Sequence, residues 1–252
     1  MESSVSHPHI YVIIIGSEIL NGRRNDRHFD FIKEALAQHG HTPYAVSIIK
    51  DDKTLMRRSF QVVLEDNESM LFCFGGIGST PDDLTRAVAA EVFTSKPLIR
   101  HKQFERDVIE RFGEGAFPNR IEMADLPEGA ELLHNPVNNM SGFSLQGRFF
   151  FTPGFPEMSH PMVQEAIAQH LPENKRLYRN SFLALCSEER FIGLMKEAPE
   201  GVECSSLPMF MDGQPNVEIS VASYDEALTE NYFRRFIDYM QESGIDYEIQ
   251  LV

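Results

Sequence analysis

The chain is 252 residues long and strongly acidic, with 23 lysines and arginines against 38 aspartates and glutamates and a formal net charge of −15 at pH 7. Because an acidic surface repels a polyphosphate backbone, nucleic acid is not an expected partner. Cys73, Cys186 and Cys204 are widely separated and suggest neither a disulfide framework nor a thiolate zinc site. The longest early apolar run, 10–15, is too short to span a membrane. We therefore expect a cytoplasmic protein without membrane contact, in which only a local site holds an anionic ligand.

The first part of the chain alternates short apolar runs with amphipathic helical segments. The run 10–15 is unbroken and ends at Gly16, as expected for a strand buried on both faces. The other expected elements are strands over 44–49 and 69–74, helices over 30–39, 54–64, 82–93 and 103–112, strands over 131–134 and 148–152, and a helix over 158–170. Strands that alternate with helices predict a βαβ series and a mostly parallel sheet of the α/β class.

A second, smaller domain is expected after the polar, proline-containing segment 171–175. Its expected elements are a strand over 177–185, a helix over 188–197, strands over 202–208 and 216–222, a helix over 224–243 and a strand over 247–251. The order βαββαβ is that of the ferredoxin-like unit. The predicted organisation is therefore a flexible tail over 1–9, an α/β domain over 10–172 and a small α+β domain over 176–252.

The glycine-rich stretch 75–85 holds the residues most able to carry chemistry. It follows an expected buried strand and opens an expected helix, which is where open α/β sheets bind ligands. Glycines let the backbone approach a ligand closely, and a helix N-terminus attracts phosphate or carboxylate. Asp82 and Asp83 would repel a bare phosphate but could hold Mg²⁺ or another divalent cation against its oxygens.

The same stretch also fits a purely structural role. The two adjacent glycines could simply end the strand, with Ser79 or Thr80 as the helix cap. Asp82 and Asp83 would then be first-turn acids favoured by the helix dipole. Spacing alone leaves both interpretations open.

Five ordered blocks of the sequence resemble one protein family. They are Gly16–Gly22 (G-D-E-L-L-x-G in the family), Asp51–Asp52, Gly75–Thr85 (G-G-x-G-x-T-x-D-D-x-T), Leu126–Ala130 with Asn135–Pro136 (P-x-G-A…N-P), and Pro153–Met158 (P-G-x-P-x-E-M). Several blocks in register are far more specific than a lone glycine motif. The chain resembles the nucleotide- and pterin-binding (MoaB/Mog-like) domain of molybdenum-cofactor biosynthesis proteins, and more closely the N-terminal domain of the competence/damage-inducible protein A (CinA) family.

This resemblance implies a three-layer α/β domain, a homodimer or homotrimer, and a site for a nucleotide or pterin. Related domains adenylylate molybdopterin, and the CinA family resembles metal-dependent pyrophosphatases that act on ADP-ribose or similar dinucleotides. By this resemblance Asp83, with Asp82 or Glu18, would be catalytic and would hold Mg²⁺ or another divalent cation. The residues expected to bind the ligand are Gly16, Ser17, Gly75, Gly76, Gly78, Ser79, Thr80, Thr85, Asn135, Pro153 and Gly154.

Some residues depart from the family pattern. Ser17 stands where the family usually has Asp, and Arg27-His28 stand where many members have Thr-Asn, so a carboxylate is lost and positive charge is expected beside the site. Glu18 could be no more than a solvated loop acid. The sequence ends at Val252 and leaves no room for the C-terminal deamidase domain of longer family members, so that activity is not expected.

Three functional hypotheses follow. The first is a metal-dependent nucleotide pyrophosphatase, that is, a hydrolase of phosphoanhydrides. The second is a non-catalytic molybdopterin- or nucleotide-binding protein that uses the same pocket. The third is a scaffold that self-associates through the edge strands of its ferredoxin-like domain. The sequence does not choose between them.

Overall fold

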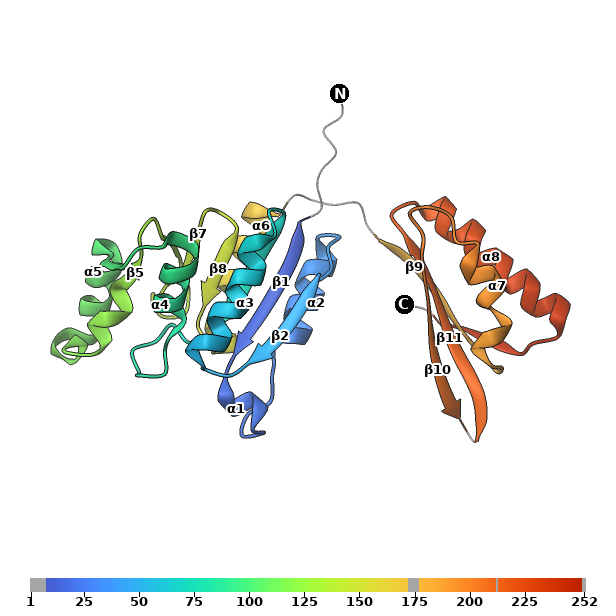
Figure 1. Ribbon diagram of the computed structural model, residues 1–252, viewed down its shortest axis with the longest axis horizontal. Coiled ribbons are helices and arrows are strands. Elements are labelled where there is room, and N and C mark those ends of the chain that lie inside the picture. Colours follow the sequence, from blue (N-terminus) through green and yellow to red (C-terminus); the bar gives the residue numbers. More distant parts are fainter. Residues whose placement is uncertain (1–7, 172–176, 212, 251–252) are drawn as a thin grey trace, which may run out of the picture. The chain divides into compact units, whose positions relative to one another are not determined.

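A computed structural model describes residues 8–171, 177–211 and 213–250, and the chain divides into two compact units, Met1–Asn174 and Lys175–Val252 (Figure 1). Residues 1–7 of the expected tail and 172–175 of the expected boundary segment lie outside the described residues. The first strand begins at His9, one residue earlier than expected. None of the described helices is long and apolar enough to cross a membrane.

The first unit is built on a six-stranded sheet with the strand order β2-β1-β3-β8-β7-β6. Strands β1 (His9–Ile15), β2 (Ala45–Ile49), β3 (Ser69–Phe74) and β8 (Phe149–Thr152) pair in parallel, which confirms the predicted α/β class. Strand β7 (Gly142–Leu145) pairs antiparallel with both β8 and β6 (Glu131–Leu133). Strand β7 was not predicted from the sequence, because it is only four residues long and buried throughout and so shows no alternation of polar and apolar residues.

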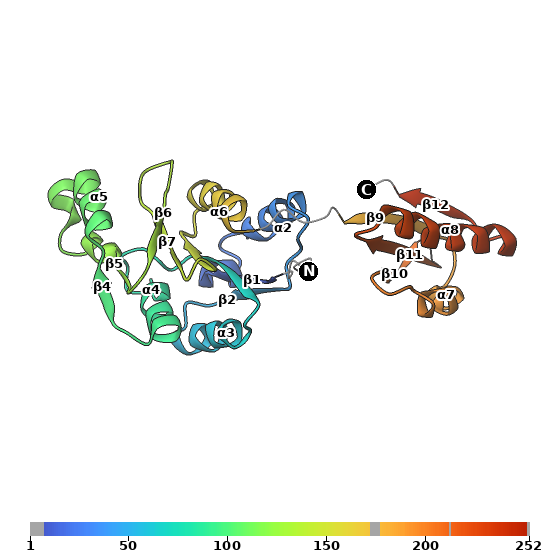
Figure 2. The same ribbon diagram turned by 90° about the horizontal axis from the view of Figure 1, so that it is seen from above.

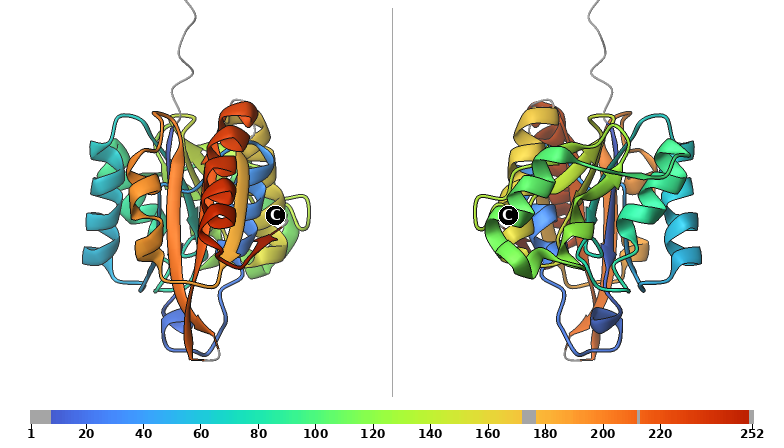
Figure 3. Two further views of the ribbon diagram at one scale, coloured as in Figure 1. Left: turned by 90° about the vertical axis from the view of Figure 1, so that its right-hand side faces the viewer. Right: turned by 90° about the vertical axis from the view of Figure 1, so that its left-hand side faces the viewer.

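Helices cover both faces of this sheet and make the predicted three layers. Helices α2 (His28–Gln38) and α6 (Pro156–His170) lie on one face, whereas α3 (Lys53–Glu65) and α4 (Thr85–Ala89) lie on the other (Figure 2 and Figure 3). The faces have separate cores, because side chains point alternately to opposite sides of a strand. A short helix α1 (Ser17–Leu20) follows β1.

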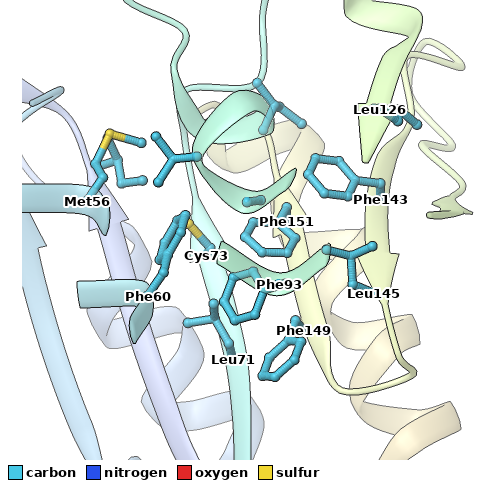
Figure 4. Packing of buried hydrophobic residues seen from close by; sticks show 14 of the residues in the cluster. Met56, Phe60, Leu71, Cys73, Phe93, Leu126, Phe143, Leu145, Phe149 and Phe151 are labelled. Atoms are coloured by element: carbon cyan, nitrogen blue, oxygen red, sulfur yellow. The ribbon is translucent and has the colours of Figure 1, made fainter. Parts of the chain in front are cut away.

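Strand β3 is buried along its whole length, as a central strand of such a sheet must be. Its Leu71 and Cys73 face the core beneath α3 and α4, where aromatic rings from several elements meet (Figure 4). The Phe93 ring lies 4.3 Å from that of Phe149, and the Phe143 ring lies 4.6 Å from that of Phe151. These contacts fix the strands whose carboxyl ends carry the site loops.

The segment expected to be one helix over 82–93 differs from that expectation. Helix α4 begins only at Thr85, and a π-helical turn, Ala90–Thr94, follows it. The interpretation of Asp82 and Asp83 as first-turn acids is therefore wrong, because both residues precede the helix. They lie in a turn that is closed by a hydrogen bond from the Asp83 N–H to the Thr80 carbonyl at 2.9 Å.

A small extension follows α4. Strands β4 (Leu98–Arg100) and β5 (Asp125–Pro127) form a two-stranded antiparallel sheet. Between them lie α5 (Lys102–Phe112) and two 3₁₀ turns, Gly113–Ala116 and Arg120–Ala124. The sequence predicted α5 but neither of these three-residue strands, which are too short to show a pattern.

The second unit contains β9 (Tyr178–Ala184), α7 (Ile192–Lys196), β10 (Glu203–Met211), β11 (Gln214–Ser223), α8 (Glu226–Ser243) and β12 (Tyr247–Gln250). Its antiparallel sheet has the order β10-β11-β9-β12, which confirms the ferredoxin-like arrangement. Phe182, Phe191 and Phe236 are buried in its core together with Val217 and Ile219. The expected helix over 188–197 is a 3₁₀ turn, Glu188–Arg190, followed by α7.

Candidate functional site

A pocket of about 610 Å³ lies at the carboxyl ends of β1, β3 and β8, where the loops of the resembling blocks meet. This is the ligand-binding edge of an open α/β sheet. The residues of the expected site that line it are Glu18, Gly75, Gly76, Gly78, Ser79, Thr80, Asp82, Asp83, Pro153 and Gly154. Four expected ligand-binding residues, Gly16, Ser17, Thr85 and Asn135, are not part of the lining.

The backbone of the glycine loop, 75–78, requires two of its glycines. Gly75 and Gly76 have φ of +99° and +70°, in the left-handed region that other residues rarely adopt. A Cβ on Gly76 would collide with the hydroxyl of Thr85, and one on Gly75 would collide with the carbonyl oxygen of Ile15. Thr85 is fully buried, and its hydroxyl donates to the Gly75 carbonyl at 2.9 Å. Thr85 therefore holds the loop from beneath.

Two carboxylates converge on one hydroxyl at the end of this loop. The Thr80 Oγ1 lies 2.5 Å from Asp82 Oδ1 and 2.7 Å from Asp83 Oδ2, and the Thr80 N–H donates to Asp83 Oδ2 at 2.8 Å. The hydrogen bond from Thr80 lowers the pKa of Asp82, which keeps this carboxylate ionised. The pocket thus contains a pair of adjacent anionic oxygens.

The buried Arg86 joins the glycine loop to the extension. Its guanidinium donates to the Gly78 carbonyl at 2.7 Å, to the Asp125 carbonyl at 3.1 Å and to the Glu122 carbonyl. Burial lowers the pKa of Arg86. The role of Arg86 was not predicted from the sequence, because arginine is mostly a surface residue and nothing in its spacing marks it as buried.

Replacing Arg86 with methionine is expected to lower the free energy of unfolding by about 2 kcal/mol, because three backbone carbonyls lose their donor. Denaturant-induced unfolding followed by circular dichroism measures this loss. The control is Arg100→Met, which removes an exposed ion pair with the Asp125 carboxylate and should cost about 1 kcal/mol or less. Equal losses of unfolding free energy in the two variants would show that the buried hydrogen bonds of Arg86 do not stabilise the fold more than an exposed ion pair does.

The loop after β1 brings Glu18 to the pocket. The start of this loop, at Ser17, is hydrogen-bonded to Asp51. The Ser17 N–H donates to Asp51 Oδ2 at 2.8 Å, and the Asp51 N–H donates to Ser17 Oγ at 3.3 Å. Asp51 itself lines the pocket, while Glu18 lies 4.0 Å from Arg24. Ser17 therefore orients a lining carboxylate without being part of the lining.

Four arginines line the pocket, although the chain as a whole is acidic. Arg23 and Arg24 follow α1, whereas Arg111 and Arg120 come from the extension, where both guanidinium groups lie over the Phe112 ring at 5.6 and 4.8 Å. Guanidinium groups are the preferred partners of phosphate oxygens. None of the four was predicted from the sequence.

The loop between β6 and β7 owes its shape to Asn135. This side chain is fully buried, and its Nδ2 donates to Asn138 Oδ1 at 2.8 Å and to the Met140 carbonyl at 3.0 Å. Asn138, Met140 and Ser141 then line the pocket. Asn135 thus shapes one wall of the pocket from behind it.

A pair of histidines supports the loop after β8. With its proton on Nε2, His28 donates to the Gly154 carbonyl at 3.4 Å, and its Nδ1 lies 3.3 Å from His160 Nε2. The His28 ring stacks on Phe74 at 4.4 Å, and the His160 ring stacks on Phe31 at 3.6 Å. Burial lowers the pKa of His28, and burial together with the neighbouring His28 lowers that of His160 to about 4.

This pair is expected to make the protein less stable in mild acid. Because the folded state keeps both rings neutral, their contribution is complete above the unfolded histidine pKa of about 6.5 and is lost as the pH falls from there towards 4. His160→Phe keeps a ring against Phe31 and should flatten the fall of the thermal midpoint over this pH range. The surface variant His134→Phe should leave the fall unchanged, and a fall that is equally steep in both variants would contradict this role.

No three histidine, cysteine, aspartate or glutamate side chains of the described residues are grouped closely enough to hold a metal ion. Glu18, Asp82 and Asp83 line one pocket, but they do not form a closed metal site.

One protein-family model matches most of the first unit. The family model described as a probable molybdopterin binding domain matches residues 11–173. The chain belongs to this family. The resemblance predicted from the five sequence blocks is therefore confirmed.

Similar proteins match different shares of this chain. A CinA-like protein of Acaryochloris marina is 30% identical over 64% of this chain, but that match spans only 39% of the relative's length. Protein TK1472 of Thermococcus kodakarensis is 26% identical over 94% of this chain and 98% of its own length. The crystal structure of a Thermoplasma acidophilum protein described as CinA with unknown function superposes with a TM-score of 0.57 and 26% identity, over 64% of this chain and 96% of that one.

Arg27 and His28, which stand where many family members have Thr-Asn, add less positive charge beside the site than expected. Arg27 pairs with Glu157 at 3.1 Å, and the buried His28 is held neutral. The cations of the lining are instead the four arginines, and the carboxylates of Glu18, Asp51, Asp82 and Asp83 balance them formally in the same pocket.

Proposed function

We propose that the first unit binds a phosphorylated nucleotide or pterin in the pocket and cleaves its phosphoanhydride bond with the help of a divalent cation. The observation that carries this proposal is the set of four arginines around a glycine loop in a chain of net charge −15. The carboxylates of Glu18, Asp51, Asp82 and Asp83 line the same pocket, so it offers guanidinium groups to phosphate oxygens and carboxylates to a divalent cation.

The glycine loop supports binding of phosphate in particular. Its positive φ angles turn the backbone at the end of β3, and Gly75, Gly76 and Gly78 bring main chain without side chains to the pocket lining. Arg23 and Arg24 line the pocket from the β1 side, and Arg111 and Arg120 line it from the extension. A ligand with more than one anionic group could therefore contact cations from two parts of the unit.

The donor set fits a magnesium ion shared with the ligand. Asp82 and Asp83 each place a carboxylate oxygen within 2.7 Å of Thr80 Oγ1, so hard oxygen donors already lie together. Mg²⁺ characteristically takes one or two carboxylates and completes its shell with water and substrate phosphates, which suits a site without a third protein ligand. When bound, such an ion would polarise a phosphoryl oxygen.

The protein's own residues would then position the ligand. Thr80 fixes the two carboxylates, Arg86 fixes Gly78, and the lining arginines would neutralise the negative charge on the phosphate oxygens. Glu18 lies beside Arg24 in the same lining and is the remaining carboxylate of the expected catalytic set.

A non-catalytic binding protein is the second candidate. It is favoured by the absence, among the described residues, of a preformed group of three metal-ligating side chains. The same pocket would then hold the ligand without cleaving it. The predicted homodimer or homotrimer, the cytoplasmic location and self-association through the second unit remain predictions.

Calorimetric titration and product analysis on the full chain distinguish these functions. We expect ADP-ribose to bind, and AMP to be released when Mg²⁺, Mn²⁺ or Co²⁺ is present but not when a chelator is added. Binding of ADP-ribose, or of 6-hydroxymethylpterin diphosphate, without any metal-dependent product would support the non-catalytic function. Failure of both compounds and of inorganic pyrophosphate to bind would contradict both functions.

A further inference from the structure

One aromatic ring of the pocket lining is largely exposed to solvent. Phe155 lines the pocket, yet 54% of its surface is exposed to solvent. It is the residue just before α6, and its carbonyl accepts the Met158 and Ser159 N–H groups at 2.9 Å. The side chain is thus presented by the rigid start of a 15-residue helix.

A cation lies next to this ring. The Arg24 guanidinium carbon is 5.2 Å from the centroid of Phe155, within the range of a cation–π contact. Arg24 is held in turn by its N–H, which donates to the Glu18 carbonyl at 3.0 Å, and by the Glu18 carboxylate at 4.0 Å. The ring and the cation come from loops that are 131 positions apart in sequence and meet at the pocket.

The other aromatic rings of the lining are less accessible. Phe104 is 3% exposed and belongs to the core. Phe112 is half-buried, and the guanidinium groups of Arg111 and Arg120 already lie over it. Of the three phenylalanines that line the pocket, Phe155 therefore offers the most free surface.

We propose that Phe155, backed by Arg24, is a stacking platform for the planar heteroaromatic ring of the ligand, a nucleobase or a pterin. This inference rests on the proposed function and adds which residue recognises the ring.

The arrangement suits a flat ring better than an aliphatic group. A nucleobase or pterin stacks on one aromatic face, and the Arg24 guanidinium, whose carbon lies 5.2 Å from the ring centroid, supports the ring by a cation–π contact. Phosphates on the same ligand would then reach the glycine loop and the lining arginines of the same pocket. The platform would thus distinguish a ring-bearing diphosphate from pyrophosphate alone.

Paired titrations of the full chain test the platform. F155A should weaken the binding of ADP and of 6-hydroxymethylpterin diphosphate by about 5- to 150-fold, as expected for loss of one base–aromatic stack, and should leave inorganic pyrophosphate binding unchanged. F155Y should restore the affinity, because it keeps the ring. The two ring-bearing probes show whether a nucleobase or a pterin is preferred.

Fluorescence provides a second measurement. The chain contains no tryptophan, so F155W introduces a single reporter at the platform. ADP or the pterin diphosphate should change its emission, whereas pyrophosphate should change it much less. The matched control is F210W, because Phe210 is 81% exposed and belongs to the second unit, and its emission should not respond to any of the probes.

The outcomes separate the platform from the proposed function. If pyrophosphate and ADP bind to the parent and F155A binds ADP as tightly as the parent does, the platform is overturned while phosphate binding stands. If ADP, the pterin diphosphate and pyrophosphate all fail to bind, the proposed function fails and the platform fails with it. A selective loss of the ring-bearing ligands in F155A, with rescue in F155Y, establishes the platform.

Discussion

Replacing Asp83 with asparagine is expected to lower metal-dependent cleavage of ADP-ribose by about a hundredfold or more, because the amide removes a hard anionic ligand from the site. The loop itself should survive the change. Asp83 Oδ2 accepts the N–H and the hydroxyl of Thr80 at 2.8 and 2.7 Å, and the amide oxygen of asparagine can accept both. The rate of AMP release at saturating substrate and Mg²⁺ measures the effect.

The matched control for this change is Asp225→Asn. Asp225 also accepts a backbone N–H, from Leu228 at 3.0 Å, but it caps α8 in the second unit. Cleavage by this control should equal that of the parent. If Asp83→Asn cleaves ADP-ribose as fast as the parent, Asp83 is not part of the catalytic site. If the parent releases no product but binds the ligand, Asp83→Asn should bind the nucleotide equally well or better, because repulsion of phosphate is reduced.

Gly76→Ala is expected to lower the free energy of unfolding by about 3 to 4 kcal/mol, as the sum of backbone strain and a steric collision. Gly76 has a φ of +70°, and an added Cβ would strike the hydroxyl of the buried Thr85. Thr85 cannot easily move, because that hydroxyl holds the Gly75 carbonyl at 2.9 Å. The midpoint of denaturant-induced unfolding measures the loss, and pyrophosphate binding should weaken with it.

Gly129→Ala separates the strain from the collision. Gly129 has a φ of +81°, yet an added Cβ would meet nothing within 4 Å. This control should therefore cost only about 1 kcal/mol. If the two variants lose the same stability, the glycine loop adapts to a side chain and the close packing onto Thr85 is not important.

The sequence predicted those parts of the site that depend on local backbone conformation. A buried strand that ends in two glycines can be recognised from a few neighbouring residues, and the parallel arrangement then places the loop at the ligand-binding edge. For this reason Gly75, Gly76 and the acidic pair were expected in the lining and are found there. Whether they bind a ligand remains a prediction.

The sequence could not predict that some polar residues of the resembling blocks are buried. Thr85 and Asn135 are polar residues in the resembling blocks and were expected to bind the ligand. Both are fully buried, and both donate hydrogen bonds to backbone carbonyls. A hydroxyl or amide is equally suited to either role. Only the packed structure shows that these two shape the loops from behind.

The arginines of the pocket were missed for a different reason. Arg24 and Arg120 lie almost a hundred residues apart in sequence and meet only because the extension after α4 brings α5 and a 3₁₀ turn to the same pocket as the loop after β1. No helical or strand periodicity connects such residues. Their convergence depends on tertiary structure, and only a known fold could have predicted it.

The hydrogen bonds that hold the loops of the pocket in place affect the entropy of ligand binding. Asp51 holds the loop after β1, Thr85 and Arg86 hold the glycine loop, and His28 holds the loop after β8. Because these contacts form on folding, the loops are already ordered before a ligand arrives, and little conformational freedom is left to lose on association. A substitution that removes any one of these hydrogen bonds should therefore weaken affinity through mobility of the loops, even where it removes no contact to the ligand.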